Sequence, residues 1–164
     1  MAGRLRRFFF PRITLPLLLR VSVVALLSYA LFGHICIPLH IEGISMEPTY
    51  HDGSFNFCWR LRYLFSPPGR RDVVAIRFAG EKVMLLKRVV ATEGEEVEFR
   101  RGRLFVNGRE MQEPYVHYPC DWNLPARVVK AGCVYVVGDN RSMPMDNHFF
   151  GNAAVKRVVG SPLW

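Results

Sequence analysis

Three short segments of the chain carry residues that together could perform nucleophilic catalysis. Ser45 lies in residues 43–49 (GISMEPT), Lys87 lies in residues 85–90 (LLKRVV), and residues 138–141 (GDNR) follow another apolar, β-branched run. A serine hydroxyl barely ionises at neutral pH, so a serine nucleophile needs a base within hydrogen-bond reach. Lysine is the base in the Ser-Lys variant of this chemistry. The histidines show no triad pattern and are interpreted as interface, surface or loop residues.

Lys87 can accept a proton only if its surroundings lower its pKa. A free lysine has a pKa near 10.4, and lowering it by about three units costs roughly 4 kcal/mol of differential solvation. Burial among apolar neighbours has this effect. Strand alternation places Lys87 on one face with Val83, Leu85 and Val89, and Arg88 on the opposite face. We therefore expect a buried Lys87 and an ion-paired Arg88, although an edge-strand lysine that prevents aggregation is the simpler alternative.

In their order and spacing, the three segments resemble the type I signal peptidases, the Ser/Lys membrane proteases that cut export signals. The resemblance runs from the apolar segment before Ser45 to about Gly151. It implies that Ser45 is the nucleophile, that Lys87 is the general base, and that the Ser45 backbone N–H stabilises the oxyanion. It implies that Asp146 is the ion-pair partner of Arg88. The residues with implied structural roles near the site are Gly43, Arg88, Asp139, Asn140, Arg141, Ser142 and Asp146.

Three positions depart from the common pattern of that family. Gly43 stands where many members carry a hydroxyl that assists the oxyanion, as in a glycine-bearing branch. Pro144 replaces a serine that orients the lysine, and His148 replaces an arginine. Either Ser142 reaches Lys87 from a different turn, or another group orients the lysine, or activity is low.

The resemblance also implies how a substrate would bind. An extended peptide would add as a strand between the segment before Ser45 and the strand that carries Lys87. Small residues, chiefly alanine, would be preferred at the first and third positions before the cut. The side chains matched to the substrate pockets are Leu39, Ile41, Met46, Tyr50 and Leu86. Plain core packing is the alternative interpretation for all five.

The chain has 164 residues, a net charge of +8 and one long apolar segment near its N-terminus. As a helix, residues 17–37 would span roughly 31 Å, close to the hydrocarbon thickness of a bilayer. Five arginines lie among the first 20 residues, so the positive-inside rule places the N-terminus in the cytoplasm and the rest outside. The charge excess therefore flanks a membrane segment and does not indicate a nucleic-acid surface.

These features predict three regions. They are a basic cytoplasmic N-terminus at 1–16, a transmembrane anchor at 17–38 and an extracytoplasmic peptidase domain at 39–164. The resemblance implies the bacterial cytoplasmic membrane. A cleavable secretory signal is the competing interpretation, because residues 28–30 (SYA) offer small residues at the offset of a cleavage site. Against it, the apolar run continues past Ala30, and cleavage there would release the serine segment from the membrane.

β-branched and aromatic runs separated by Gly, Pro and Asn follow the apolar segment and predict strands. The predicted strands are 54–59, 72–78, 83–91, 95–100, 103–106, 128–137 and 155–159. Residues 97–106 are typical of a hairpin with its turn near Gly102, and Asn107-Gly108 supplies a second turn. The Pro-rich segment 114–125 is predicted to be a loop. The predicted fold class is mainly β, a folded antiparallel sheet or β-barrel behind one N-terminal transmembrane helix.

No metal, nucleotide or organic cofactor is needed for this chemistry. The four cysteines lack a paired CxxC spacing, so a zinc site is not expected, although Cys120 and Cys133 could close a short disulfide loop. The expected partners are preprotein signal peptides and membrane lipid, without nucleic acid, and the protein is expected to be a monomer. Alternating aromatic and basic residues at 59–65 fit either a lipid interface or a turn packed on the core.

Two further functions stay open. A dedicated processing peptidase for conjugation or surface-assembly substrates would have the same anchor and a domain of the same size. A catalytically weak, membrane-tethered β domain that binds exported chains would account for Pro144 and His148. Self-cleaving repressors share the Ser/Lys chemistry, but they carry a DNA-binding domain for which this chain has no room.

Overall fold

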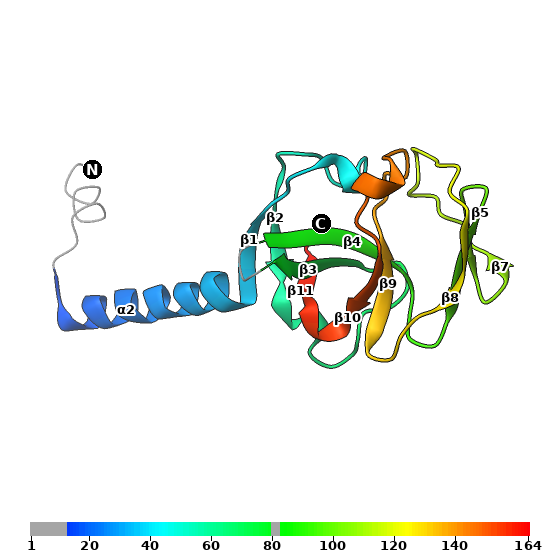
Figure 1. Cartoon of the computed structure of the whole chain (residues 1–164). Coiled ribbons are helices and arrows are strands. Elements are labelled where there is room, and N and C mark those ends of the chain that lie inside the picture. Colours follow the sequence, from blue (N-terminus) through cyan, green and yellow to red (C-terminus); the bar gives the residue numbers. More distant parts are fainter. Residues whose placement is uncertain (1–12, 80–82) are drawn as a thin grey trace. The chain divides into compact units, whose positions relative to one another are not determined.

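A long apolar helix forms the first of two compact units. The computed structural model describes residues 13–79 and 83–164. Contacts divide the chain into Met1–Ile35 and Cys36–Trp164 (Figure 1). The helix runs to Ile35 and has 21 residues with a mean hydropathy of 2.0. In the described part of the chain it is the one helix long and apolar enough to cross a membrane.

This helix begins and ends slightly earlier than the sequence predicts. Helix α2 covers Leu15–Ala30 and continues through a π-helical turn at Leu31–Ile35, whereas the predicted segment was 17–37. Strand β1 then begins at Cys36. Pro38 explains the early end, because proline has no N–H for the helix and biases the preceding residue toward an extended backbone.

The described residues of the second unit form strands joined by loops and short 3-10 turns, without an α-helix. Their bounds are β1 Cys36–His40, β2 Phe55–Trp59, β3 Val73–Ala79, β4 Val83–Ala91, β5 Glu96–Arg100, β6 Arg103–Val106, β7 Arg109–Glu110, β8 Leu124–Val128, β9 Cys133–Val137, β10 Gly151–Ala154 and β11 Val158–Pro162. Short 3-10 turns at Ile44–Met46, Arg60–Tyr63, Met145–Asn147 and Val155–Arg157 connect some of them.

The strands form two sheets in which every pair is antiparallel. The seven-stranded sheet has the order β1-β2-β11-β3-β4-β9-β10, and the four-stranded sheet has the order β7-β6-β5-β8. Figure 1 shows β5, β7 and β8 at one end of this unit and β1 and β2 at the other. The predicted class, mainly antiparallel β behind one apolar helix, is confirmed.

The predicted hairpin between β5 and β6 is also confirmed. Arg100 pairs with Arg103, and the two residues between them, Arg101 and Gly102, both have positive φ, at 48° and 75°. This is the conformation of a type I′ turn. A Cβ on Gly102 would lie 1.9 Å from the carbonyl oxygen of Cys120. Glycine is therefore required by both the turn and the neighbouring backbone.

Some predicted boundaries were wrong. The predicted strand 128–137 begins too early, because β9 covers only Cys133–Val137 and a turn with Gly132 at φ 67° separates it from β8, which ends at Val128. The predicted strand 155–159 begins later, since Val155–Arg157 forms a 3-10 turn before β11. Strands β1, β7 and β10 were missed, and β8 begins inside the predicted loop 114–125.

Three apolar clusters form the core of the second unit. One lies with the four-stranded sheet and includes Phe99, Trp122 and Tyr135, and another lies around Val74, Val89 and Val136. The third consists of Leu39, Ile41, Met46, Cys58, Ala75 and Leu86. The predicted disulfide is not formed: all four cysteines are free, and Cys120 Sγ donates to the carbonyl oxygen of Gly102.

Candidate active site

Ser45 lies in the 3-10 turn Ile44–Met46, between β1 and β2. Gly43 enters this turn with a φ of 92°, a conformation that glycine adopts without steric cost. The N–H of Gly43 donates to Asp52 Oδ1 at 2.7 Å, and the carbonyl oxygen of Ser45 accepts from the Asn140 N–H at 3.1 Å. The backbone that carries the serine is thus held on both sides.

Lys87 lies within β4 and reaches this serine from a distant part of the sequence. Its side chain is buried, with 2% of the residue exposed, as predicted. Nζ donates to Ser45 Oγ at 2.7 Å, and it has no other hydrogen bond to the described residues. Burial lowers the pKa of Lys87 to about 8, while the charge of Asp139 opposes this shift. Near pH 8 about half of the amines are therefore neutral and able to accept a proton.

Arg88, the next residue on β4, makes a bidentate ion pair. Its Nε and Nη2 donate to the two carboxylate oxygens of Asp139 at 2.7 and 2.6 Å, and its guanidinium lies 4.0 Å from the ring centre of Tyr115. The predicted partner, Asp146, was wrong, because that residue is exposed. Strand register explains the difference: Arg88 pairs with Val137 across β4 and β9, so Asp139 follows directly beyond the paired residues.

A second buried ion pair connects this region to the four-stranded sheet. Arg141 is 1% exposed, and its Nη2 and Nη1 donate to the carboxylate of Glu113 at 2.5 and 3.2 Å. The Tyr115 hydroxyl donates to Glu113 at 2.8 Å. Glu113 and Tyr115 lie in the segment after β7, and sequence reasoning missed both. That segment has no helix or strand periodicity, so no signal marked them.

Thr49 was also missed, although it belongs to the serine segment. Its hydroxyl donates to Asp139 Oδ2 at 2.5 Å. Asp139 therefore accepts hydrogen bonds from Arg88 and from the chain segment that carries Ser45, and it is fully buried. The predicted structural role of Asp139 fits this position between the two segments.

Ser142 does not replace the serine that Pro144 removes. Its hydroxyl donates to Asn140 Oδ1 at 2.7 Å, and Asn140 Nδ2 donates to the carbonyl oxygen of Ile44 at 3.1 Å. Ser142 and Asn140 therefore support the turn that carries the serine. The sequence left open whether Ser142 reaches Lys87, another group orients the lysine, or activity is low. The first of these predictions is wrong, because the Ser142 hydroxyl bonds to Asn140.

His148 lies in the loop between the 3-10 turn Met145–Asn147 and β10, as predicted for a loop residue, but it is buried and not at the surface. It is 5% exposed, and its Nε2 accepts from the Gly138 N–H at 3.0 Å. Burial lowers the pKa of His148 to about 3, and the nearby charges of Lys87 and Arg141 act in the same direction. The ring is therefore neutral throughout the physiological range.

A small hollow of ≈ 30 Å³ adjoins Ser45. Four of the five predicted pocket side chains line it, namely Leu39, Ile41, Met46 and Leu86. Met84 and Leu85 line it as well and were not predicted. The fifth predicted residue, Tyr50, is half-buried and packs against the same apolar cluster without lining the hollow. The hollow beside Ser45 therefore has room for a group about as large as a water molecule or a methyl group.

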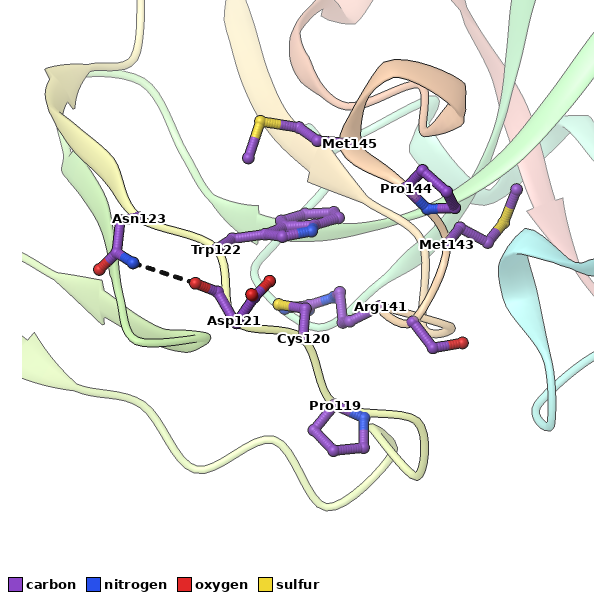
Figure 2. A pocket seen from close by; sticks show the side chains of 10 residues that line it. Pro119, Cys120, Asp121, Trp122, Asn123, Arg141, Met143, Pro144 and Met145 are labelled. Carbon is purple, nitrogen blue, oxygen red and sulfur yellow. Dashed lines mark hydrogen bonds between the residues drawn. The ribbon is translucent and has the colours of Figure 1, made fainter.

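A larger hollow of ≈ 550 Å³ lies between residues 119–123 and 141–145 (Figure 2). Trp122 lines it and belongs to the core cluster against which Met145 packs. Of the predicted site residues only Arg141 and Ser142 line this hollow, so it is separate from the space beside Ser45. No group of three or more potential metal-binding side chains occurs within residues 13–79 and 83–164.

Comparisons with known proteins agree with this arrangement. The family model of signal peptidases, peptidase family S26, matches residues 14–163. A probable signal peptidase I-1 of Synechocystis sp. is 32% identical over 163 residues, which cover 94% of this chain and 82% of the relative. Signal peptidase I V of Bacillus subtilis is 31% identical over 154 residues, 85% of this chain and 90% of the relative.

A plant protein is similar over a shorter part. Thylakoidal processing peptidase 1 of Arabidopsis thaliana is 32% identical over 136 residues, which cover 75% of this chain and 39% of the relative. The family match extends through the apolar helix and the strands described above. The chain belongs to the signal peptidase I family, peptidase family S26, and is a membrane-anchored serine endopeptidase that removes signal peptides from preproteins.

Proposed function

We propose that Ser45 is the nucleophile and Lys87 the general base with which this signal peptidase cuts its substrates. The observation that carries this proposal is the 2.7 Å hydrogen bond between Lys87 Nζ and Ser45 Oγ. Two further properties support it. Lys87 is buried, no carboxylate of the described residues is hydrogen-bonded to its amine, and its pKa is lowered to about 8. A neutral amine is the form that can take the serine proton.

The proposed reaction has two stages. Neutral Lys87 takes the hydroxyl proton as Ser45 Oγ bonds to the carbonyl carbon before the cut. The lysine then returns this proton to the departing amine, and the C–N bond breaks to leave an acyl-enzyme. In the second stage Lys87 takes a proton from water, which attacks the ester. The proton returns to Ser45 Oγ, so the signal peptide leaves as a carboxylic acid and the enzyme is restored.

The backbone N–H of Ser45 is the proposed donor to the oxyanion that forms in each stage. Gly43 offers no second donor, because it lacks a hydroxyl and its N–H is already bound to Asp52 at 2.7 Å. This support is therefore sparser than in family members that carry a hydroxyl at that position. Asp139, Asn140, Arg141 and Ser142 are proposed to act as scaffold, since each bonds to backbone or to another polar side chain near the serine turn.

The preprotein is proposed to bind as an added strand beside the first half of β4. Strand β9 pairs with β4 only from Arg88 to Ala91, which leaves an unpaired edge at Met84–Lys87. Free N–H and C=O groups at a sheet edge can pair with an extended peptide. The hollow of ≈ 30 Å³ beside Ser45 would then receive a small side chain. This supports a preference for alanine before the cut.

We also propose the bacterial cytoplasmic membrane as the location, with residues 1–16 in the cytoplasm, the anchor at 17–38 and the peptidase domain at 39–164 outside. The arginines before the anchor support this orientation. Leu64 and Phe65 are 63% and 96% exposed and follow two arginines, which supports contact with membrane lipid. A monomer is proposed because one chain supplies every group of the dyad and its scaffold.

The experiment is cleavage of a preprotein with an alanine-type site by the purified full chain in detergent. Wild type is compared with Ser45→Ala and Lys87→Ala at equal folded concentration. We expect both variants to lose at least about a hundredfold in rate, the contribution of a nucleophile or base. Ser66→Ala and Lys156→Ala, which remove exposed side chains outside the site, serve as matched controls and should cleave normally. Cleavage by Ser45→Ala at the wild-type rate would refute the dyad.

A further inference from the structure

His148 has one hydrogen-bonding role that its surroundings define. Nε2 accepts from the Gly138 N–H at 3.0 Å, so this nitrogen carries no proton and the proton of the neutral ring lies on Nδ1. The ring makes an edge-to-face contact with Trp122, with the centroids 4.9 Å apart, and lies 6.1 Å from Phe150. The described residues supply no partner for Nδ1, which is fully buried.

The Gly138 peptide lies directly against the backbone of the nucleophile. A Cβ on Gly138 would be 2.2 Å from the carbonyl oxygen of Ser45, so no side chain fits between them. The carbonyl oxygen of Gly138 accepts from Arg141 Nε at 2.7 Å. Together with the bond to His148, both polar groups of this glycine are held by buried side chains. Asn140 follows and donates its N–H to the Ser45 carbonyl oxygen at 3.1 Å.

The unpaired Nδ1 points to a role for the acceptor nitrogen. A buried donor without a partner destabilises the fold, and an apolar side chain of similar size would avoid this cost. An apolar side chain would, however, leave the Gly138 N–H without its acceptor. Burial disfavours protonation of this ring, and the charges of Lys87 and Arg141 act in the same direction. A neutral acceptor therefore fits here better than a charged or an apolar group.

We propose that His148 is a positioning residue of the catalytic site. Its Nε2 holds the Gly138 turn against the backbone of Ser45 and thereby keeps Ser45 Oγ at hydrogen-bond distance from Lys87. This proposal rests on the Ser45–Lys87 dyad and adds to it the neutral group that fixes its geometry. Lys87 itself has no second side-chain partner among the described residues. The alignment of Lys87 Nζ with Ser45 Oγ therefore depends mainly on the fixed position of the serine.

The test compares two amide substitutions of the same residue. His148→Gln places an amide near Nε2 and can still accept from Gly138, whereas His148→Asn has its amide near Nδ1 and cannot reach. We expect His148→Asn to lower kcat about tenfold or more with KM changed less than about twofold, since small misplacements cost large factors in rate. We expect His148→Gln to retain most of the activity.

The pH profile separates positioning from a loss of folded protein. Loosening the turn admits water to Lys87 and weakens the burial that lowers its pKa, so the acidic limb of kcat/KM should move up by about half a unit in His148→Asn. Partial unfolding would lower the amplitude without moving this limb. Tyr135→Phe removes a different buried, unpaired polar atom from the same region and should leave kcat and the limb unchanged.

Several outcomes would overturn the proposal. One is a folded His148→Asn enzyme with wild-type kcat and an unmoved acidic limb. Another is an equal loss in His148→Gln and His148→Asn, which would show that the acceptor is not what matters. Should His148→Asn not fold, His148→Phe keeps the ring packing on Trp122 without an acceptor and takes its place. Failure of the dyad is distinguishable, since it would appear as activity of Ser45→Ala.

Discussion

Lys87 and Arg88 are neighbours on β4, yet their side chains have opposite surroundings. The Lys87 amine has one hydrogen bond to the described residues, to the Ser45 hydroxyl. Arg88 donates to both oxygens of Asp139 and to the Arg71 carbonyl oxygen, and it lies over the Tyr115 ring. Burial lowers the pKa of the lysine to about 8. Burial would lower the pKa of Arg88 too, but Asp139 outweighs it and raises that pKa.

The comparison shows how one strand can hold Arg88 as a cation and favour the neutral form of Lys87. A buried charge persists where a counter-charge and hydrogen bonds compensate its lost hydration. The scaffold behind the site meets this condition, because Asp139 pairs with Arg88 and Glu113 pairs with Arg141. Among the described residues, none gives the lysine such compensation at hydrogen-bond distance. Its poor solvation therefore keeps part of the amine neutral and able to accept the Ser45 proton.

The largest expected effect breaks the lysine side of this comparison. Lys87→Met should reduce kcat/KM about a thousandfold or more, because the general base is lost. The free energy of unfolding at pH 7 should stay the same or rise, since a poorly solvated amine is replaced by an apolar side chain of similar length. Preprotein cleavage and urea denaturation measure the two quantities. A large loss of stability in Lys87→Met would show that the amine is well compensated after all.

Arg88→Met is the matched change on the other side of the strand. It should lower the free energy of unfolding by about 3–5 kcal/mol, because the fully buried Asp139 loses its cation. Urea denaturation of both methionine variants at the same pH makes the comparison direct. Equal stabilities would mean that the two faces of β4 do not differ as described.

The pH dependence of stability sharpens the comparison further. The pKa of Lys87 is about 8 in the folded protein and 10.5 in the unfolded chain, so the unfolded chain binds more protons between these values. Stability should therefore rise with pH in this window, by about 3 kcal/mol in total from this group. The difference in unfolding free energy between wild type and Lys87→Met isolates this contribution. A difference that does not change between pH 7 and 10 would contradict the lowered pKa.

The smallest expected effect lies at the edge of the scaffold. Tyr115→Phe removes the 2.8 Å hydrogen bond to Glu113 but keeps the ring beneath Arg88. The free energy of unfolding should fall by about 1 kcal/mol, as for one hydrogen bond. The acidic limb of kcat/KM should not move, because the surroundings of Lys87 are unchanged. A shift of that limb would mean that the two sides of β4 are coupled through Tyr115.

Local patterns predicted the elements that carry the dyad well. Alternation and β-branched residues gave the bounds of β4 as 83–91, which the structure has, and placed Lys87 in the interior. The order of the three segments predicted that Ser45 and Lys87 lie together, and they are hydrogen-bonded. Their catalytic roles remain predictions, which Ser45→Ala and Lys87→Met test.

Contacts between distant segments were predicted poorly. The choice of Asp146 over Asp139 failed because the partner depends on the register of β4 with β9, which no local pattern specifies. Glu113 and Tyr115 contribute through an irregular segment, and His148 was interpreted as a surface or loop residue. In each case the decisive information is which distant segments lie side by side. That information is a property of the folded sheet and not of any short stretch of sequence.

The ion pair between Glu113 and Arg141 limits how far this enzyme could be trimmed. Glu113 lies between β7 and β8 of the four-stranded sheet, whereas Arg141 donates to the Gly138 carbonyl oxygen beside the nucleophile. Excising residues 93–132 to obtain a miniature peptidase would remove Glu113 and leave the buried Arg141 guanidinium without its carboxylate. The turn that Arg141 holds would then lose its support. A shortened version would need a substitute carboxylate, or an uncharged replacement for Arg141, before it could be transplanted onto another anchor.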